Sequence, residues 1–436
     1  MVRPLVVLAF LSAFFLDQAR SQTVLSQPDP VLTGSITRSV SLSDFDVNGY
    51  SIISRSETAH RIGSLQLSKD GGDVFVGEQV AVYGKIDHKR HKVEATKIIF
   101  LEPEPRPLSG IAVIDRILKP ASGNDLLLRA DGYVIKIDSG SKVSFASPLA
   151  ALADVKANNW ITYHGILNPD GILVTDTISF QINHVSDREG KLLKKTTYDP
   201  AAIPAKAKQG TASKYLTEWN PKKTPPYKDQ AMQERVTGIG TSLIPSYQRQ
   251  LPAGDPTKIA FLFQVVDRPN SHEAFVFPSG IILIPHQVVE RLQNDSQVAA
   301  VLAYNMAIAL EKQEYRMQPA YTSMSVADFA IGAGGAFVPG LSLASLAMYP
   351  KSKSMETDLF NQSGRVSLGL LHDAGYDIQQ APIAWWILAA KPGKNFTEIN
   401  IPSRSLNLYR TIGLVWKNYP DTAAGAHTPT TTSSTN

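Results

Sequence analysis

Residue types that support catalysis are sparse and scattered in this sequence. Cysteine is absent, which excludes a cysteine nucleophile, thiolate metal ligands and redox chemistry. The Gly-x-Ser-x-Gly motif of α/β-hydrolases, the P-loop and the dinucleotide fingerprint are also missing. Among the nine histidines, His88 and His91 are the one close pair, and the basic residues around them disfavour a bound cation. A functional site must therefore be sought in the order and spacing of several predicted strands and helices.

Such a pattern occurs in the second half of the chain, where four features follow one another. A strand is predicted over Lys258–Val266, followed by a strand, a Pro/Gly turn and a second strand over Glu273–Ile284. A helix is expected from about Ser296 to Gln313, where Asn294 and Gln297 have the spacing of a capping box. Its middle is apolar all round, which predicts a buried helix. A Leu-rich helix then leads into Ala374-Gly-Tyr-Asp377.

These features resemble metallopeptidase family 48, the CAAX prenyl protease type of gluzincin. That family has an edge strand ending Asn-Ala-Phe-x-x-Pro-Gly-Gly, a helix running Leu-Ala-x-Val-Leu-Ala-His-Glu-x-x-His, and later Glu-x-Glu-Ala-Asp and Ala-Gly-Tyr-Asp. Glu273 to Gly280, Val298 to Ala303 and Ala374 to Asp377 match parts of these motifs in order and spacing. The resemblance covers residues 233–420 and implies an α+β zincin-like domain.

The positions that hold zinc in that family carry other residues here. The resemblance places Tyr304 at the first His, Asn305 at the catalytic Glu and Ile308 at the second His, with Gln362 at the third ligand. Two ligands four residues apart share one face of a helix, so both must be metal-binding types. Isoleucine has no lone pair, asparagine is no general base at neutral pH, and tyrosine coordinates as phenolate. No catalytic residue, no metal and no cofactor are therefore expected.

The replacements have a physical logic. A buried carboxylate without its metal costs several kcal/mol, on the order of an unpaired buried charge, and the amides of Asn305 and Gln362 remove that cost. Ile308 fills the metal cavity with apolar volume. Tyr304, Asn305 and Gln362 are expected to form a satisfied polar cluster, or alternatively to hydrogen-bond a ligand in the former cleft.

The substrate edge of the family is retained, which predicts a binding role. An extended polypeptide is expected to add as a strand along the segment from Glu273 to Gly280. The residues expected at this edge are Glu273, Ala274, Phe275, Pro278 and Gly280. His272 and Glu273 are interpreted as loop residues and not as an acid–base pair.

The start of the chain has the features of a signal peptide. Arg3 precedes an apolar run of about a dozen residues, short of the ~20 that span a bilayer, and Ala19 and Ser21 suit a cleavage site. Residues 1–21 are therefore predicted to be removed from an exported, periplasmic or extracellular protein, the alternative being an uncleaved membrane anchor.

Residues 30–185 are predicted to be β-rich. Gly77–Gly84 followed by Lys92–Phe100 resembles Asn159–Gly165 followed by Ile172–Phe180, since each pair has a strand ending in Gly, a polar turn and a strand ending Ile-x-Phe. The Asn-Pro-Asp-Gly turn of the second pair favours a hairpin. We predict two barrel-like units, similar to OB-like repeats in exported bacterial proteins.

The remaining segments connect or extend these units. Residues 186–232 are rich in lysine and proline and are interpreted as a linker, the alternative being a basic arm on an anionic surface. The uncharged stretch around Gly332–Gly335 is interpreted as a packed helical hairpin, with peripheral membrane contact as the alternative. Residues 421–436 are Thr/Ser-rich and expected to be disordered.

Composition limits the function classes further. The chain of 436 residues is 43% hydrophobic and 19% charged, and its net charge of +4 is too mild to indicate nucleic acid as a partner. The leading hypothesis is a non-catalytic binder of polypeptide or envelope proteins. One alternative is a zinc-dependent envelope endopeptidase with other ligands. Another is a structural protein that binds its partner through the β units.

Overall fold

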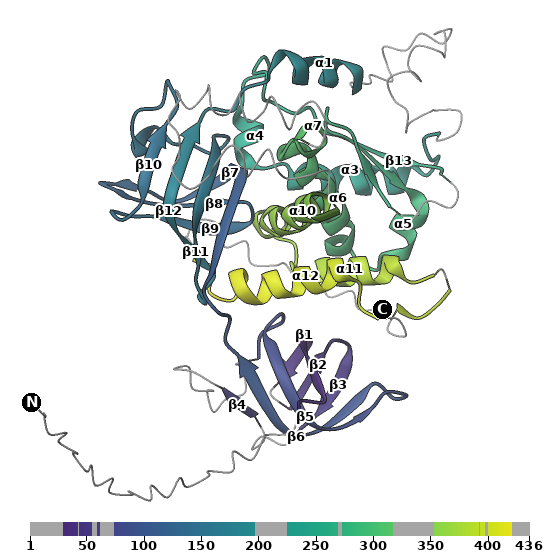
Figure 1. Cartoon of the computed structure of the whole chain (residues 1–436). Coiled ribbons are helices and arrows are strands. Elements are labelled where there is room, and N and C mark those ends of the chain that lie inside the picture. Colours follow the sequence, from purple (N-terminus) through teal and green to yellow (C-terminus); the bar gives the residue numbers. More distant parts are fainter. Residues whose placement is uncertain are drawn as a thin grey trace, which may run out of the picture.

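The computed structural model of the chain describes two β units and a helical unit (Figure 1). Described are residues 29–41, 43–54, 59–61, 74–196, 225–268, 273–316, 353–391, 393–396 and 400–420. The predicted signal peptide, the hairpin around Gly332–Gly335, His272, the tail at 421–436 and residues 197–224 of the predicted linker lie outside these residues.

The first β unit is a small closed barrel. Its strands are β1 (Leu32–Ser41), β2 (Asp44–Val47), β3 (Tyr50–Ile53), β4 (Ala59–Arg61), β5 (Gln79–Asp87) and β6 (Lys92–Leu101). They follow the order β3-β2-β1-β5-β6-β4, and a parallel pairing of β3 with β6 closes five of them into a ring. The barrel has its own hydrophobic core, which includes Phe45, Val82 and Phe100.

The second β unit repeats this arrangement. Its strands are β7 (Arg106–Ser122), β8 (Asp125–Ala130), β9 (Tyr133–Ile137), β10 (Lys142–Phe145), β11 (Trp160–Leu167) and β12 (Ile172–Gln181). The strand order is β10-β12-β11-β7-β8-β9, and a parallel pairing of β9 with β12 closes the ring. Read from β9 to β10, this is the order of the first barrel with six added to each strand number. The predicted β-rich half with two small barrel-like units is confirmed.

The two similar sequence stretches are the hairpins β5–β6 and β11–β12. In each hairpin the register shifts at the glycine that ends the motif, Gly84 or Gly165. A Cβ on Gly84 would lie 2.0 Å from the carbonyl oxygen of Glu94, and one on Gly165 would lie 2.2 Å from that of Val174. Both positions therefore require glycine because the neighbouring strand passes too close for a side chain.

The helical unit contains a three-stranded sheet at its side (Figure 1). Helix α1 (Asp187–Thr196) precedes it, and its helices are α3 (Gln230–Leu243), α4 (Ser246–Gln250), α5 (His286–Arg291), α6 (Asp295–Leu310), α7 (Gln313–Arg316), α10 (Lys353–Asp373), α11 (Gln380–Ala389) and α12 (Ser403–Thr411). Helix α12 continues into a π-helical turn at Ile412–Trp416. Strands β13 (Leu262–Val266), β14 (Phe275–Val276) and β15 (Ile281–Pro285) have the order β13-β15-β14, with β13 parallel and β14 antiparallel to β15.

Helix α6 lies in the middle of the helical unit. The side chain of Asn294 accepts a hydrogen bond from the backbone N–H of Gln297 at 2.9 Å, as the capping motif predicts. The side chain of Gln297 accepts from Gln293, one residue before the expected partner, at 2.8 Å. Thirteen of the sixteen residues of the helix are buried, so the predicted buried helix is confirmed, with its end at Leu310.

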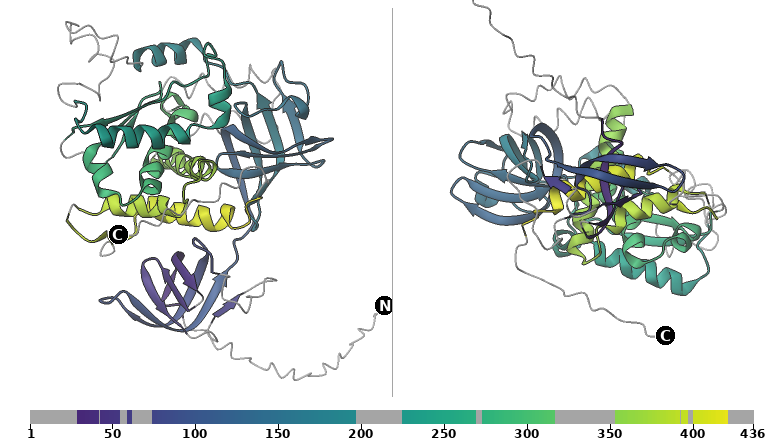
Figure 2. Two further views of the ribbon diagram at one scale, coloured as in Figure 1. Left: turned by 180° about the vertical axis from the view of Figure 1, so that it is seen from behind. Right: turned by 90° about the horizontal axis from the view of Figure 1, so that it is seen from below.

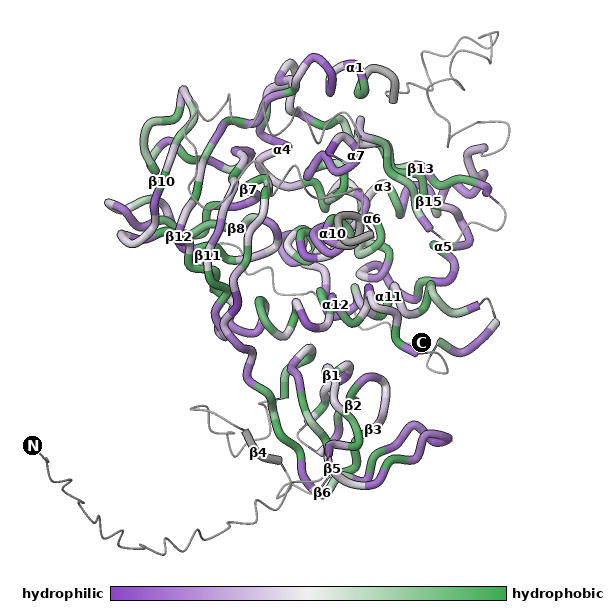
Figure 3. The backbone as a smooth tube through the Cα atoms, viewed as in Figure 1, coloured by the Kyte–Doolittle hydropathy of each residue, from purple (hydrophilic) through white to green (hydrophobic). Residues whose placement is uncertain are grey.

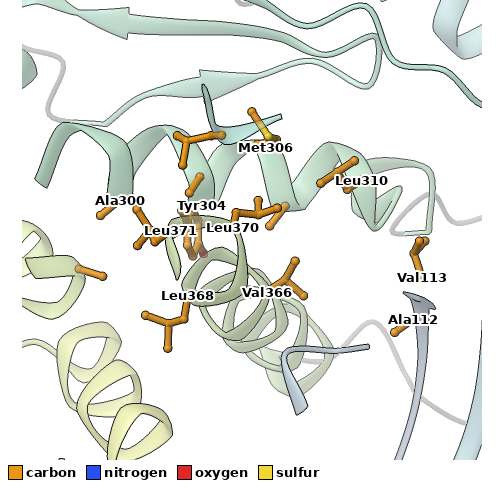
Figure 4. Close-up of a cluster of buried hydrophobic side chains, with 14 of the residues drawn as sticks. Ala112, Val113, Ala300, Tyr304, Met306, Leu310, Val366, Leu368, Leu370 and Leu371 are labelled. Carbon is orange, nitrogen blue, oxygen red and sulfur yellow. The ribbon is translucent and has the colours of Figure 1, made fainter. Parts of the chain in front are cut away.

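The second barrel and the helical unit share one hydrophobic core. The cluster runs from Ile114 on β7 through Val301 on α6 to Leu371 on α10. Figure 4 shows Ala112 and Val113 of β7 beside Leu310 at the end of α6. Because the core is continuous, the second barrel and the helices form one folding unit.

Buried ion pairs reinforce this contact. The guanidinium of Arg129 on β8 lies 2.9 Å from Asp115 on β7 and 2.6 Å from Asp373 on α10, and its side chain is 1% exposed. Arg365 on α10 pairs with Asp131, which follows β8, at 2.5 Å. Burial opposes the charge of Arg129, but the two carboxylates raise the pKa of its guanidinium above the ordinary value.

The first barrel packs against the end of the helical unit and lies below α12 in both side views (Figures 1 and 2). A Cβ on Gly77 would lie 2.4 Å from the backbone nitrogen of Gly413, so the two backbones touch here without side chains. Glu78 pairs with Lys417 at 2.5 Å beside this contact. Across the described ranges, the search for a helix with the length and apolarity of a membrane span found none.

Candidate functional site

Tyr304, at the position of the first zinc ligand, lies between α6 and α10 beside Leu370 and Leu371 (Figure 4). Its side chain is buried, and its hydroxyl has no hydrogen-bond partner among the described residues. The ring meets Trp385 edge to face at 5.1 Å, and the guanidinium of Arg404 lies 4.8 Å from its centroid. Burial raises the pKa of Tyr304 to about 12, so at pH 7 only about one molecule in 10⁵ carries the phenolate that would bind a metal.

Asn305, at the position of the general base, is turned back onto its own helix. Its side-chain amide donates to the backbone carbonyl of Val301 at 2.8 Å, and the residue is buried. An amide held in this way has no basic atom to offer a water molecule.

Gln362, at the position of the third ligand, is engaged elsewhere. Its amide nitrogen donates to the backbone carbonyl of Ile111 at 3.0 Å, and its oxygen accepts from Arg316 at 3.0 Å and from Gln313 at 3.2 Å. The expected polar cluster of Tyr304, Asn305 and Gln362 is therefore wrong, since no hydrogen bond of the described residues joins them. The side chain of Gln362 is hydrogen-bonded to the second barrel, and that of Asn305 is hydrogen-bonded to the backbone of its own helix.

Ile308, at the position of the second zinc ligand, lines a cavity of about 440 Å³. Val276, Phe277 and Pro278 line the same cavity, so the position that the resemblance aligns with the second zinc ligand and the predicted polypeptide edge border one space. Ile259 and Leu310 add apolar surface. Within the described ranges, no group of three His, Asp or Glu side chains is placed to hold a metal ion.

A buried ion pair stands at one end of the cavity. Lys312 lies 2.8 Å from Glu189 of α1, and both side chains line the cavity. Burial lowers the pKa of Lys312, and the nearby carboxylate partly restores it. The sequence did not single out this pair, because Glu189 lies in the predicted linker and becomes a wall residue only when α1 packs beside the end of α6.

Strand β14 forms the edge of the sheet next to this cavity. The backbone N–H of Phe277 donates to Ile281 at 2.8 Å. Hydrogen-bonded and non-hydrogen-bonded pairs alternate in antiparallel strands, so Val276 and its partner Ile282 form a non-hydrogen-bonded pair. The N–H and C=O of Val276 therefore point away from β15, toward the edge where no further described strand pairs.

The other predicted edge residues flank Val276. Phe275 lies under the guanidinium of Arg268 at 4.3 Å, and Ala274 is half-buried. Gly280 has a φ of +90°, and a Cβ there would lie 2.3 Å from Ile259, so glycine is required at the turn. Pro278 lines the cavity directly.

Glu273 marks the far end of the edge. It is exposed and lies 3.9 Å from Arg404, the residue that also covers the rings of Tyr304 and Trp385. No sequence pattern indicates a role for Arg404, which comes from α12, more than one hundred residues after β14. The structure thus joins Glu273 and Tyr304 through one arginine and leaves Gln362 apart.

Comparison of the sequence with models of known protein families gives no match, and comparison with curated proteins gives none.

Proposed function

We propose that this chain is an exported protein whose helical unit derives from the zincin type of metallopeptidase and holds an extended polypeptide without cutting it. The observation that carries the proposal is the placement of Val276. Its outward N–H and C=O lie on the edge of β14 that pairs with no other described strand, and Val276 and Ile308 line one cavity.

The edge suits a polypeptide strand for physical reasons. An incoming strand bonds to the outward backbone groups, each net hydrogen bond contributing about 0.5–1.5 kcal/mol, while alternate side chains enter the cavity. The cavity is mainly apolar along Ile259, Val276 and Ile308, which favours aliphatic or aromatic side chains of the bound segment.

The same positions argue against hydrolysis by the mechanism of the resembled family. That mechanism needs a metal-bound water and a carboxylate to accept its proton. Here Asn305 donates to Val301 and burial keeps Tyr304 neutral, so neither side chain supplies the required anion. Binding without cleavage is what the remaining groups support.

The proposal is tested with the full chain and a permanently unfolded, fluorescently labelled polypeptide. Val276→Pro removes the outward N–H, which makes no bond inside the sheet, so the β14–β15 pairing is retained. We expect the dissociation constant to rise about tenfold, as the loss of one hydrogen bond worth about 1.4 kcal/mol predicts.

The matched control is Val276→Thr, which keeps the N–H and the shape of the side chain. It is expected to bind like the parent chain. Equal binding by the proline and threonine variants, or no binding by the parent chain, would show that β14 is not the binding edge.

A further inference from the structure

A second cavity lies on another face of the helical unit, between the start of β7, α10 and α12. Its volume is about 330 Å³. Four arginines line it, one from β7, one from α10 and two from α12, and none of the described lining residues is an Asp or a Glu: Arg106, Arg365, Arg404 and Arg410. Asp131 and Glu273 pair with two of these arginines from outside the wall, so Arg106 and Arg410 supply the positive charge that is left for a ligand.

Two of these arginines have structural partners. Arg365 is held by Asp131 at 2.5 Å and lies over the ring of Tyr133 at 4.8 Å. Arg404 lies over Trp385 at 4.2 Å and reaches toward Glu273. These contacts fix the two side chains in place, so part of the cavity wall is preorganised.

The other two arginines have no such role. Arg106 at the start of β7 and Arg410 on α12 are exposed and form no ion pair with a described residue. They come from segments about three hundred residues apart in the sequence, and both line this cavity. Both also line an adjoining cavity whose wall includes Glu78, Glu102, Glu104 and Asp170, but no ion pair of the described residues joins them to these carboxylates. Bringing two unpaired guanidinium groups together is unfavourable without an anion between them.

Neutral donors complete the wall. The side-chain oxygen of Asn361 on α10 accepts from Asn407 on α12 at 2.8 Å, which leaves the amide nitrogen of Asn361 without a described partner. At the rim, the side chain of Phe360 is 38% exposed, and Leu108 and Leu414 add apolar surface. The cavity wall therefore combines exposed charged donors with the partly buried apolar side chains of Leu108 and Leu414.

We propose that this cavity binds the phosphate group of an anionic ligand. Guanidinium forks match the geometry of phosphate oxygens and form charge-assisted hydrogen bonds with them, and a dianion neutralises the two unpaired charges best. The volume accommodates a phosphate with a few attached carbon atoms, for which Leu108 and Leu414 offer apolar surface. Both a soluble phosphate ester and the headgroup of an anionic phospholipid present this chemistry.

The site shares Arg404 with the far end of the polypeptide edge, where that arginine pairs with Glu273, but its two unpaired arginines lie apart from the edge. Val276 lies outside its wall, and Arg106 and Arg410 lie outside the wall of the cavity beside β14. A Val276→Pro chain is therefore expected to keep its phosphate binding, which separates failure of this proposal from failure of the proposed function.

The test measures binding of inorganic phosphate to the full chain by calorimetry at low salt. Co-sedimentation is measured in parallel with vesicles of phosphatidylcholine alone and of phosphatidylcholine mixed equally with phosphatidylglycerol. The double variant Arg106→Gln with Arg410→Gln is expected to weaken binding by at least about tenfold, because each lost charge-assisted bond contributes about 1.5–3 kcal/mol.

The matched control removes two exposed positive charges elsewhere, with Arg90→Gln and Lys119→Gln. It is expected to bind like the parent chain. Phosphate binding without vesicle binding assigns a soluble ester, and binding to the phosphatidylglycerol vesicles assigns a lipid headgroup. The proposal is overturned if neither probe binds, or if the control loses as much affinity as the cavity variant.

Discussion

The side-chain amide of Gln362 on α10 donates a hydrogen bond to the backbone carbonyl of Ile111 on β7, at 3.0 Å. Two residues further along β7, the backbone N–H of Val113 donates to the carboxylate of Glu311, which follows α6, at 3.3 Å. One strand of the second barrel is therefore attached to both helices that would carry the zinc ligands in the resembled family. Gln362, which the resemblance aligns with the third zinc ligand, has a structural partner on the second barrel.

Replacing Gln362 tests this structural role. Gln362→Leu leaves Ile111, Gln313 and Arg316 each without one hydrogen bond, so the free energy of unfolding is expected to fall by about 2 kcal/mol. Urea denaturation followed by circular dichroism measures the change. Gln379→Leu is the control, since that side chain bonds to no described residue, and it is expected to change stability by no more than about 0.5 kcal/mol. Equal effects of the two substitutions would contradict the role.

Arg129 is expected to be the most sensitive polar residue of the contact between barrel and helices. Arg129→Met leaves Asp115 buried without its partner, which costs about 3–5 kcal/mol. The control is Arg116→Gln, which removes a pair with Asp373 whose arginine is 32% exposed and is expected to cost less than about 1 kcal/mol.

The same pair of variants reports on cooperativity. Since the second barrel and the helices share one core, we expect them to unfold in one transition, seen alike by tryptophan fluorescence and circular dichroism. If the Arg129 variant unfolded at one denaturant concentration by tryptophan fluorescence and at another by circular dichroism, the second barrel and the helices would not unfold as one unit.

The buried carboxyl group of Glu311 predicts that the free energy of unfolding depends on pH. Burial raises the pKa of its carboxyl group well above the ordinary value. The folded state therefore binds a proton more tightly than the unfolded state, so the stability that this group contributes is complete below about pH 4.5 and is lost as the pH rises through the folded pKa.

Glu311→Gln removes this titration and keeps an oxygen to accept from Val113. We expect the variant to be about 1 kcal/mol more stable than the parent chain at pH 8, with the difference vanishing near pH 4. Urea denaturation across this range measures it. A difference that does not change with pH would mean that Glu311 has an ordinary pKa.

The sequence predicted local features better than contacts between distant segments. The barrel hairpins could be predicted from Gly84 and Gly165, because the neighbouring strand passes too close for any other residue at these positions. The start of α6 was likewise readable from Asn294, whose cap is formed within three residues.

The contacts that were missed join segments far apart in sequence. In the sequence, Arg129 cannot be told from any other arginine on a strand. Only the fold brings Asp373 of α10 within 2.6 Å of its guanidinium. Glu189 gave no signal within a lysine-rich segment, although it pairs with Lys312 at the cavity. The expected polar cluster failed for the same reason, since β7 supplies the partner of Gln362 and no local pattern reveals that strand.

The most direct test of the account measures binding and cleavage of an unfolded polypeptide together. The full chain is incubated with the labelled polypeptide and one equivalent of zinc, binding is followed by fluorescence anisotropy, and the polypeptide is then examined by intact-mass spectrometry. The account predicts saturable binding and a polypeptide of unchanged mass, because Tyr304 stays neutral and Asn305 is held by its own helix. Fragments that form with zinc and disappear with a chelator would contradict it, as would the absence of binding.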